Sequence, residues 1–333
     1  MRKDVWTTRA AIASNLKPNR GRGQACAALL ASIGWSGAWA QTPDQLSIPP
    51  PLIVENQVQR VSERVYVILD GDRRFVPNVG IVVGNRATLV IDPGLGTQNG
   101  ELVLRETRKV STNEELYLVS THYHAEHSAG LEAFPSTAIV IRSREQQREI
   151  DESGLSHMQR LSQLSPTIAV LLEGVSFRSA DILFDDEFNL DLGGATVRMY
   201  AVGPAHTFGD TVIFVEEDGV AFAGDVAMQR YPLFASPFSG VASWRKALAA
   251  LARLDATVVV PSHGPMGDSD VVENYDRLFS TLQSRVAELK QEEWSIPEIA
   301  ELLTQELAPQ FTRWGQGEDR IGVIVRAAYS EIP

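Results

Sequence analysis

The chain has 333 residues, of which 44% are hydrophobic and 22% are charged, and its formal net charge is −12 at pH 7. This length and apolar content allow one large domain or two medium ones with a sizeable core. Because no Lys/Arg cluster interrupts the acidic balance, the sequence argues against nucleic-acid binding and leaves a small molecule as the expected partner. It carries no signal for an oligomeric state.

The first forty residues are typical of a targeting segment. An apolar run starts near Ala25 and ends in Ala38-Trp39-Ala40 before Gln41, which is the A-x-A pattern of a signal-peptide cleavage site. The run is too short for a comfortable transmembrane helix, so we expect no stable membrane insertion. We expect residues 1–40 to be a signal peptide and the mature chain to be periplasmic or secreted; the alternative is an N-terminal helix or tail that is not removed. The single cysteine, Cys26, lies within that segment, which leaves no disulfide or thiolate ligand.

The rest of the chain predicts a mixed α/β domain. Residues 41–60 are polar and rich in proline and are predicted to be a linker. Short β-branched segments bounded by Gly or Pro predict strands at 64–70, 78–83, 87–92, 115–120, 137–141, 187–192, 195–202, 210–217, 220–223 and 257–261. Helices are predicted at 96–110, 144–165, 242–254, 271–292, 296–306 and 320–330. Strands with helices interspersed occur in both the first and the second half of the domain. This pattern indicates two sheets packed face to face with helices outside, followed by a helical extension over 269–333.

Three of the six histidines lie within six residues, directly after the strand predicted at 115–120. In extended backbone His122 and His124 point to the same side, so both can hold one ion. Glu126 and His127 follow one turn later and can face a second ion. Imidazole and carboxylate ligands suit zinc. The alternative, a solvated His-rich loop, is disfavoured because this spacing seldom arises at such a low histidine content.

Further ligand types follow other predicted strands. His206, Asp225 and His263 each come just after a strand, which predicts that they converge on one rim of the sheets. His157 lies instead in a polar helical stretch, and we expect it to be a surface residue.

The motifs resemble the metallo-β-lactamase superfamily, and within it the glyoxalase-II-like exported hydrolases. In chain order they are Val90-Ile91-Asp92-Pro93-Gly94, Thr121-His122-x-His124-x-Glu126-His127, His206-Thr207-x-Gly209-Asp210, Gly224-Asp225 and Ser262-His263-Gly264. The resemblance implies a four-layer αβ/βα sandwich over 61–268 with a two-zinc site at one edge.

The resemblance also implies individual roles. The first metal would be held by His122, His124 and His206, the second by Glu126, His127 and His263, with Asp225 bridging the two and Asp92 in the outer shell. Glu126 departs from the family, which has Asp there; its side chain is one methylene longer, and we expect it to ligate the second metal and hold the attacking water. Tyr231 and Tyr123 are weaker candidates as donors to the leaving group, since each is more often a packing aromatic.

Together these residues predict a zinc-dependent hydrolase in which a metal-bound hydroxide attacks an ester, thioester or lactone. The resemblance favours these substrates because β-lactamases of this fold typically have Cys or Ser near the position of Asp225. Three alternatives remain: a β-lactamase, an enzyme like the mononuclear-iron sulfur dioxygenases, and a non-catalytic relay or binding protein of an exported dehydrogenase system.

Overall fold

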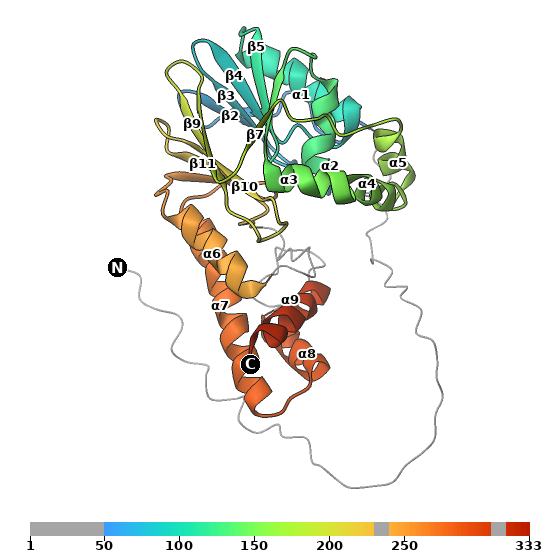
Figure 1. Cartoon of the computed structure of the whole chain (residues 1–333), viewed down its shortest axis with the longest axis vertical. Helices are drawn as coiled ribbons and strands as arrows, with labels where there is room; N and C mark the ends of the chain where they lie inside the picture. The colour runs from blue at the N-terminus through green and yellow to red at the C-terminus, as the bar shows by residue number, and fades with distance from the viewer. Residues whose placement is uncertain (1–49, 230–239, 308–317) are drawn as a thin grey trace. The chain divides into compact units, whose positions relative to one another are not determined.

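A computed structural model describes residues 50–229, 240–307 and 318–333. The predicted signal peptide and Tyr231 lie outside the described residues. Two β-sheets face each other, and helices cover the outer face of each sheet (Figure 1).

The first sheet has seven strands that lie in the same order as in the chain. The strands are β1 (Val58–Arg60), β2 (Val65–Ile68), β3 (Val79–Val83), β4 (Ala87–Ile91), β5 (Glu115–Val119), β6 (Ile139–Ser143) and β7 (Ile182–Phe184). Strands β1 to β4 pair antiparallel, whereas β4 to β7 pair parallel. Every residue of β4 is buried, as expected for a strand covered on both faces.

The second sheet has five strands in the order β12-β11-β10-β9-β8. Their bounds are β8 (Glu187–Asp191), β9 (Thr196–Ala201), β10 (Thr211–Val215), β11 (Val220–Gly224) and β12 (Val258–Pro261). Strands β8 to β11 pair antiparallel, and β11 pairs parallel with β12. Each sheet therefore has a parallel pair, β4 with β5 and β11 with β12, whose carboxyl ends carry the motifs.

Three hydrophobic clusters fill the spaces between the layers. The one between the sheets joins residues such as Leu89 and Val119 to Met199 and Phe222. A second cluster packs the outer face of the first sheet against its helices, and a third does the same for the second sheet. The helices on the first sheet are α1 (Gly96–Val110), α2 (Ala125–Ser128), η3 (Ala129–Ala133), α3 (Arg144–Glu149), η4 (Ile150–Gly154), α4 (Leu155–Ser162) and α5 (Pro166–Leu172). The predicted four-layer αβ/βα sandwich is confirmed.

The C-terminal helices share a core with the second sheet. They are α6 (Val241–Ala252), α7 (Asp270–Gln291), α8 (Ile296–Leu307) and α9 (Glu318–Glu331). Trp244 of α6 is fully buried against Phe279 of α7, with ring centroids 5.0 Å apart, and its indole N–H donates to the carbonyl of Val226. The helical extension is thus continuous with the domain through one apolar cluster.

The structure corrects the predicted linker. Leu52 and Ile53 are buried in the cluster that covers the first sheet, and β1 pairs with β2, so the residues from 52 onward belong to the domain. Strand β1 forms because it pairs with β2, and the sequence of β1 alone does not predict a strand. Strand β7 and helix α5 were also not predicted, and the helix predicted at 144–165 contains a turn of π-helix, η4.

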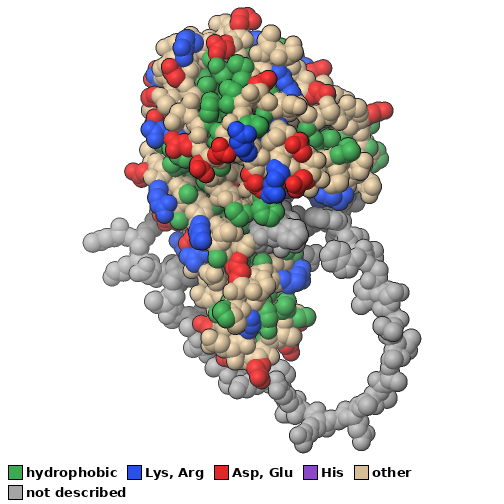
Figure 2. Space-filling model, viewed as in Figure 1, with side chains coloured by type: hydrophobic (Ala, Val, Ile, Leu, Met, Phe, Trp, Pro, Cys, Tyr) green, Lys and Arg blue, Asp and Glu red, His purple; other side chains and the backbone are tan. Residues whose placement is uncertain are grey.

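No helix in the described parts of the chain combines the length and apolarity needed to cross a membrane. On the face drawn in Figure 2, acidic and basic side chains are interspersed and neither forms a large patch of one sign.

Candidate metal centre

The predicted ligands come from loops at one edge of the two sheets. Asp92 follows β4, His122 follows β5, Asp225 follows β11 and His263 follows β12. Because β4 and β5 are parallel, and β11 and β12 are parallel, each pair presents its carboxyl ends together. His206 lies in the turn between β9 and β10, and a backbone hydrogen bond of 2.7 Å from Thr211 to Thr121 ties that turn to the loop after β5.

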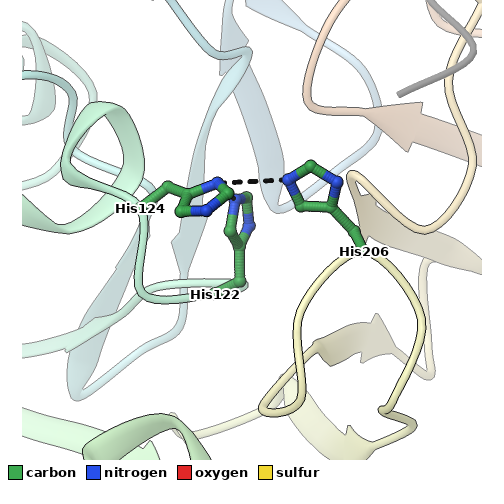
Figure 3. A group of neighbouring side chains, drawn as sticks. All are labelled: His122, His124 and His206. Carbon is green, nitrogen blue, oxygen red and sulfur yellow. Dashed lines mark hydrogen bonds between the residues drawn. The ribbon is translucent and has the colours of Figure 1, made fainter. Parts of the chain in front are cut away.

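The imidazole rings of His122, His124 and His206 form the first group of ligand atoms (Figure 3), and the carboxylate of Asp225 lies beside two of them. Nδ1 of His124 lies 3.0 Å from Nε2 of His122 and 3.1 Å from Nε2 of His206. Oδ2 of Asp225 is 3.2 Å from Nε2 of His206 and 4.0 Å from Nε2 of His122. His122 and His206 are buried, and His124 is half-buried.

This arrangement suits a divalent cation better than a set of hydrogen bonds. A ring nitrogen carries either one proton or one lone pair, so Nδ1 of His124 can bond to only one of the two Nε2 atoms beside it. Zinc–nitrogen bonds of about 2.0–2.1 Å in a tetrahedral site place ligand atoms about 3.3–3.4 Å apart. The four distances given above, from 3.0 to 4.0 Å, bracket that spacing.

A second group of ligand atoms, also within 4.8 Å of one another, comes from His122, His127 and Asp225, and His263 lies beside that carboxylate. Oδ1 of Asp225 is 3.9 Å from Nε2 of His127 and 3.8 Å from Nε2 of His263. Oδ1 of Asp225 and Nε2 of His127 are both buried and have no hydrogen-bond partner among the described residues. Buried polar atoms normally find partners, so this convergence marks a place for a cation.

Asp92 holds the ring of His127 from behind. Its Oδ2 lies 3.0 Å from Nδ1 of His127, and its oxygens accept from the backbone N–H and the hydroxyl of Thr121 at 2.7 and 2.8 Å. Asp92 has φ 54°, in the left-handed region, which Asp tolerates better than most residues. Gly224 has φ 58°, and a Cβ there would lie 2.8 Å from Cβ of Thr121, so glycine allows Asp225 to enter the site.

A separate network holds His263. Its Nδ1 lies 3.0 Å from the carbonyl of Val76 and donates to it, which leaves the lone pair on Nε2, facing Asp225. The side-chain amide of Asn78 donates to the carbonyls of Pro261 and Gly264 at 2.8 Å. Such backing of a ligating imidazole fixes its tautomer and orientation.

Two buried carboxylates fix the loop that carries His206. Glu149 of α3 accepts from the backbone N–H groups of Phe208 and Gly209 at 2.9 and 2.8 Å. Asp210 accepts from the backbone and the hydroxyl of Thr207 at 2.8 and 2.9 Å. Burial raises the pKa of Asp210 to about 8, although the hydrogen bonds from Thr207 favour its charged form.

The histidines of the site differ in the direction in which their surroundings shift the pKa. Burial lowers the pKa of His122 and of His124 well below the ordinary value, and the neighbouring imidazoles lower it further. Burial also lowers the pKa of His127, but the charge and hydrogen bond of Asp92, together with the charge of Asp225, outweigh burial and raise it to about 9. The carboxylates around His127 therefore favour a positive charge, which a proton or a metal ion can supply.

Glu126 belongs to neither group of possible metal ligands in the described residues. Its Oε2 faces Nε2 of His157 at 3.7 Å. The prediction that His157 is a surface residue is wrong, because its ring stacks on that of His124 with centroids 4.4 Å apart and an interplanar angle of 7°. Tyr123 packs beside both rings, and burial, followed by the charge of Glu149, raises the pKa of its hydroxyl to about 12.

The model of the metallo-beta-lactamase superfamily matches residues 72–263, which is more than half of the chain and ends at the last predicted ligand, His263. The chain belongs to this superfamily. The match begins within the segment between β2 and β3 and covers all the loops that build the two groups of ligand atoms.

Two sequence relatives extend this result. The chain is 25% identical over 183 residues to the beta-lactamase-like protein 2 homolog of Caenorhabditis elegans, a match that covers 54% of this chain and 52% of that protein. It is 24% identical over 196 residues to the acyl-coenzyme A thioesterase MBLAC2 of Homo sapiens, covering 55% and 68%. The match thus spans about half the length of the nematode relative.

Solved structures share the fold. A metallo-beta-lactamase from Pontibacter korlensis covers 67% of this chain and 98% of its own, with a TM-score of 0.54 and 22% identity. The inverting sec-alkylsulfatase Pisa1 from Pseudomonas sp. covers 82% of this chain and 50% of its own, with a TM-score of 0.62 and 15% identity. Most superfamily relatives with named activities are hydrolases, so this chain has a hydrolase-type fold with a His/Asp cluster that suits a divalent metal.

Sequence reasoning missed the residues that support the ligands. His157, Asn78 and Glu149 lie in no motif, and each reaches the site from an element that is distant in sequence from the loop it holds. The sequence offered one sign of such a role. Asn78 stands at the start of an apolar strand, where a buried polar side chain needs a hydrogen-bond partner.

Proposed function

We propose that this chain is a zinc-dependent hydrolase that holds two ions, one on each side of Asp225, and cleaves an ester, thioester or lactone. The observation that carries the proposal is the position of this carboxylate. Its Oδ2 faces His206 and its Oδ1 faces His127 and His263, all from separate loops. A shared carboxylate suits two ions about 3.5–4 Å apart, as in other two-metal hydrolases.

Zinc ions bound there would supply Lewis acidity and a water that ionises near neutral pH. The protein contributes the fixed geometry. Asp92 orients His127, the carbonyl of Val76 orients His263, and Glu149 holds the loop of His206. Because His127, His206 and His263 are buried and these contacts fix their rings or loops, the site needs little rearrangement during the reaction.

Two points support the substrate class. The resemblance of the motifs implies that Asp at position 225 is unlike β-lactamases of the fold, and one sequence relative is an acyl-coenzyme A thioesterase. The fold is shared with an alkylsulfatase as well, so alkyl sulfates belong among the substrates tested.

The test is a substrate panel at defined zinc content. The metal-free protein is loaded with zero, one or two equivalents of zinc and assayed on an ester, a thioester, a lactone, a phosphodiester, an alkyl sulfate and a β-lactam. We expect turnover of the ester, thioester or lactone to exceed that of the β-lactam, to disappear with a chelator and to return with zinc. Turnover that is indifferent to chelation, or confined to the β-lactam, contradicts the proposal.

A further inference from the structure

Glu126 and His157 form a pair beside the ligand groups described above. Oε2 of Glu126 and Nε2 of His157 face each other across 3.7 Å, and each side chain is 12% exposed. Both atoms are buried and have no hydrogen-bond partner among the described residues, and the 3.7 Å between them is within ion-pair range if His157 is protonated. The carboxylate that follows the first two histidines in the motif is thus directed towards α4.

The position of His157 is fixed by the packing of α4 and by the ring of His124. The imidazole lies flat on that of His124, and Tyr123 meets it edge-on at 5.5 Å. Met158 and Leu161 bury the neighbouring face of α4, and a Cβ at Gly154 would lie 2.7 Å from the ring of Phe177. The packing of α4 therefore restricts the side chain of His157 to its position beside His124.

The turn of π-helix before α4 accounts for this orientation. Residues 150–154 wind as a π-helix between α3 and α4. One extra residue in a turn rotates all that follows by about 100° relative to a regular helix, and such turns are frequent at functional sites. Without the extra residue, a different face of α4 would be turned towards His124.

We propose that His157 acts as a positioning residue that holds Glu126 away from the second metal. This inference rests on the proposed function. The second ion then has three protein ligands, His127, His263 and Asp225, whereas the first has His122, His124, His206 and Asp225. Three protein ligands leave a position open for an oxygen of the substrate, as in catalytic zinc sites, and the second ion binds more weakly than the first.

The alternative is that Glu126 ligates the second ion, as its place in the motif predicts. The two assignments differ in metal stoichiometry. The test compares the wild-type protein with Glu126→Ala, and uses His263→Ala as the matched control that removes a proposed ligand from the same side of Asp225. Metal is counted by elemental analysis after dialysis, the second dissociation constant is measured by titration with a competing chelator, and circular dichroism checks the fold.

We expect Glu126→Ala to keep two ions with a second dissociation constant within about threefold of wild type, and His263→Ala to keep one. His157→Phe preserves the stacked ring and removes Nε2, so Glu126 is released to reach the ion. Its second dissociation constant should fall by about tenfold, within the range by which outer-shell partners change metal affinity. The double variant Glu126→Ala/His157→Phe should return to the wild-type value, because the carboxylate that was released is gone.

Cobalt substitution gives a second readout, since visible absorption reports the ligand number of the ion. His157→Phe should change the spectrum of the second cobalt ion, and Glu126→Ala should not. Loss of one ion from Glu126→Ala, or an unchanged second dissociation constant in His157→Phe, overturns the inference while leaving the proposed function in place. A wild-type protein that binds no divalent ion overturns both.

Discussion

The two groups of ligand atoms around Asp225 are built in different ways. In the first, the nitrogen atoms of His122, His124 and His206 lie 3.0–3.1 Å apart where loops of the two sheets meet. In the second, His127 and His263 stand 3.9 and 3.8 Å from the carboxylate. The geometry of the first group depends on how the loops of the two sheets meet. The geometry of the second group depends on the residues that hydrogen-bond to the far side of each imidazole ring.

The supporting residues explain this difference. Asp92 backs His127 and the carbonyl of Val76 backs His263, so each ring in the second group has its own buried partner. The first group is held by hydrogen bonds to its loops, from Thr211 to Thr121 and from the 208–209 backbone to Glu149. Substitution of a residue that supports a ring, such as Asp92, should therefore weaken binding of the second ion. Substitution of the shared carboxylate, Asp225, should weaken binding of both ions.

The largest effect is expected from Asp225→Asn. This change keeps the shape of the side chain but removes its charge and replaces one oxygen by an N–H group. Since Oδ1 and Oδ2 face different histidines, both ions should be weakened and kcat/KM should fall by at least about 10³-fold. Elemental analysis and steady-state kinetics check this, and activity within tenfold of wild type would remove Asp225 from the centre of the site.

A pair of variants separates the two ions. His206→Ala should weaken the first ion and His263→Ala the second, each lowering kcat/KM on the order of 10²–10³-fold. Titration of each variant with zinc should show one remaining site, with a different affinity in the two proteins. Equal loss of both ions from both variants would mean that the two groups form one cooperative site.

The pKa of His127 predicts how the metal-free protein responds to pH. Because the folded pKa is raised to about 9, the protonated form stabilises the fold fully below the ordinary value of 6.5, and this contribution is lost as pH rises through 9. The difference in the free energy of unfolding between wild type and His127→Gln should shrink by about 3 kcal/mol between pH 6.5 and 9. Urea unfolding in the presence of a chelator measures it.

The comparison with His127→Gln is needed because Asp210 acts in the same direction. Its raised pKa also removes stability as pH rises towards 8, in both proteins equally. A difference between the two proteins that stays constant from pH 6.5 to 9 would show that Asp92 and Asp225 do not raise the pKa of His127.

A smaller effect is expected from Asp92→Asn. Asn tolerates the left-handed backbone at this position, so the change tests the charge behind His127 and not the turn. The second ion should bind about 10–100-fold more weakly, while the first changes little. Competition titration measures both constants, and a larger loss at the first ion would show that Thr121, which Asp92 also holds, carries the effect to His122.

The positions of the metal ligands at the ends of strands could be predicted from the sequence. His122, Asp225 and His263 directly follow apolar β-branched runs, and parallel pairing brings such ends together, so their convergence follows from local pattern. The extended backbone at 122–124 likewise predicted two histidines facing one point, and the structure places both in the first group. Bounds of the main strands and of α1 followed from the same periodicity.

Tertiary contacts decided the rest. Strand β1 and the buried Leu52 depend on neighbours that no local pattern shows, which is why 41–60 was predicted to be a linker. His157 lies in a polar stretch, and its contact with His124 depends on the turn of π-helix before α4 and on the packing of that helix. Glu126 could be placed in the motif from the sequence, but the direction of its longer side chain could not.

The most direct test of a metal centre shared through Asp225 is anomalous diffraction from crystals of the zinc-loaded protein. We expect two zinc peaks about 3.5–4 Å apart, with Oδ2 of Asp225 bound to the ion between His124 and His206 and Oδ1 bound to the ion between His127 and His263. A single peak, or two peaks of which neither touches Asp225, would contradict the account.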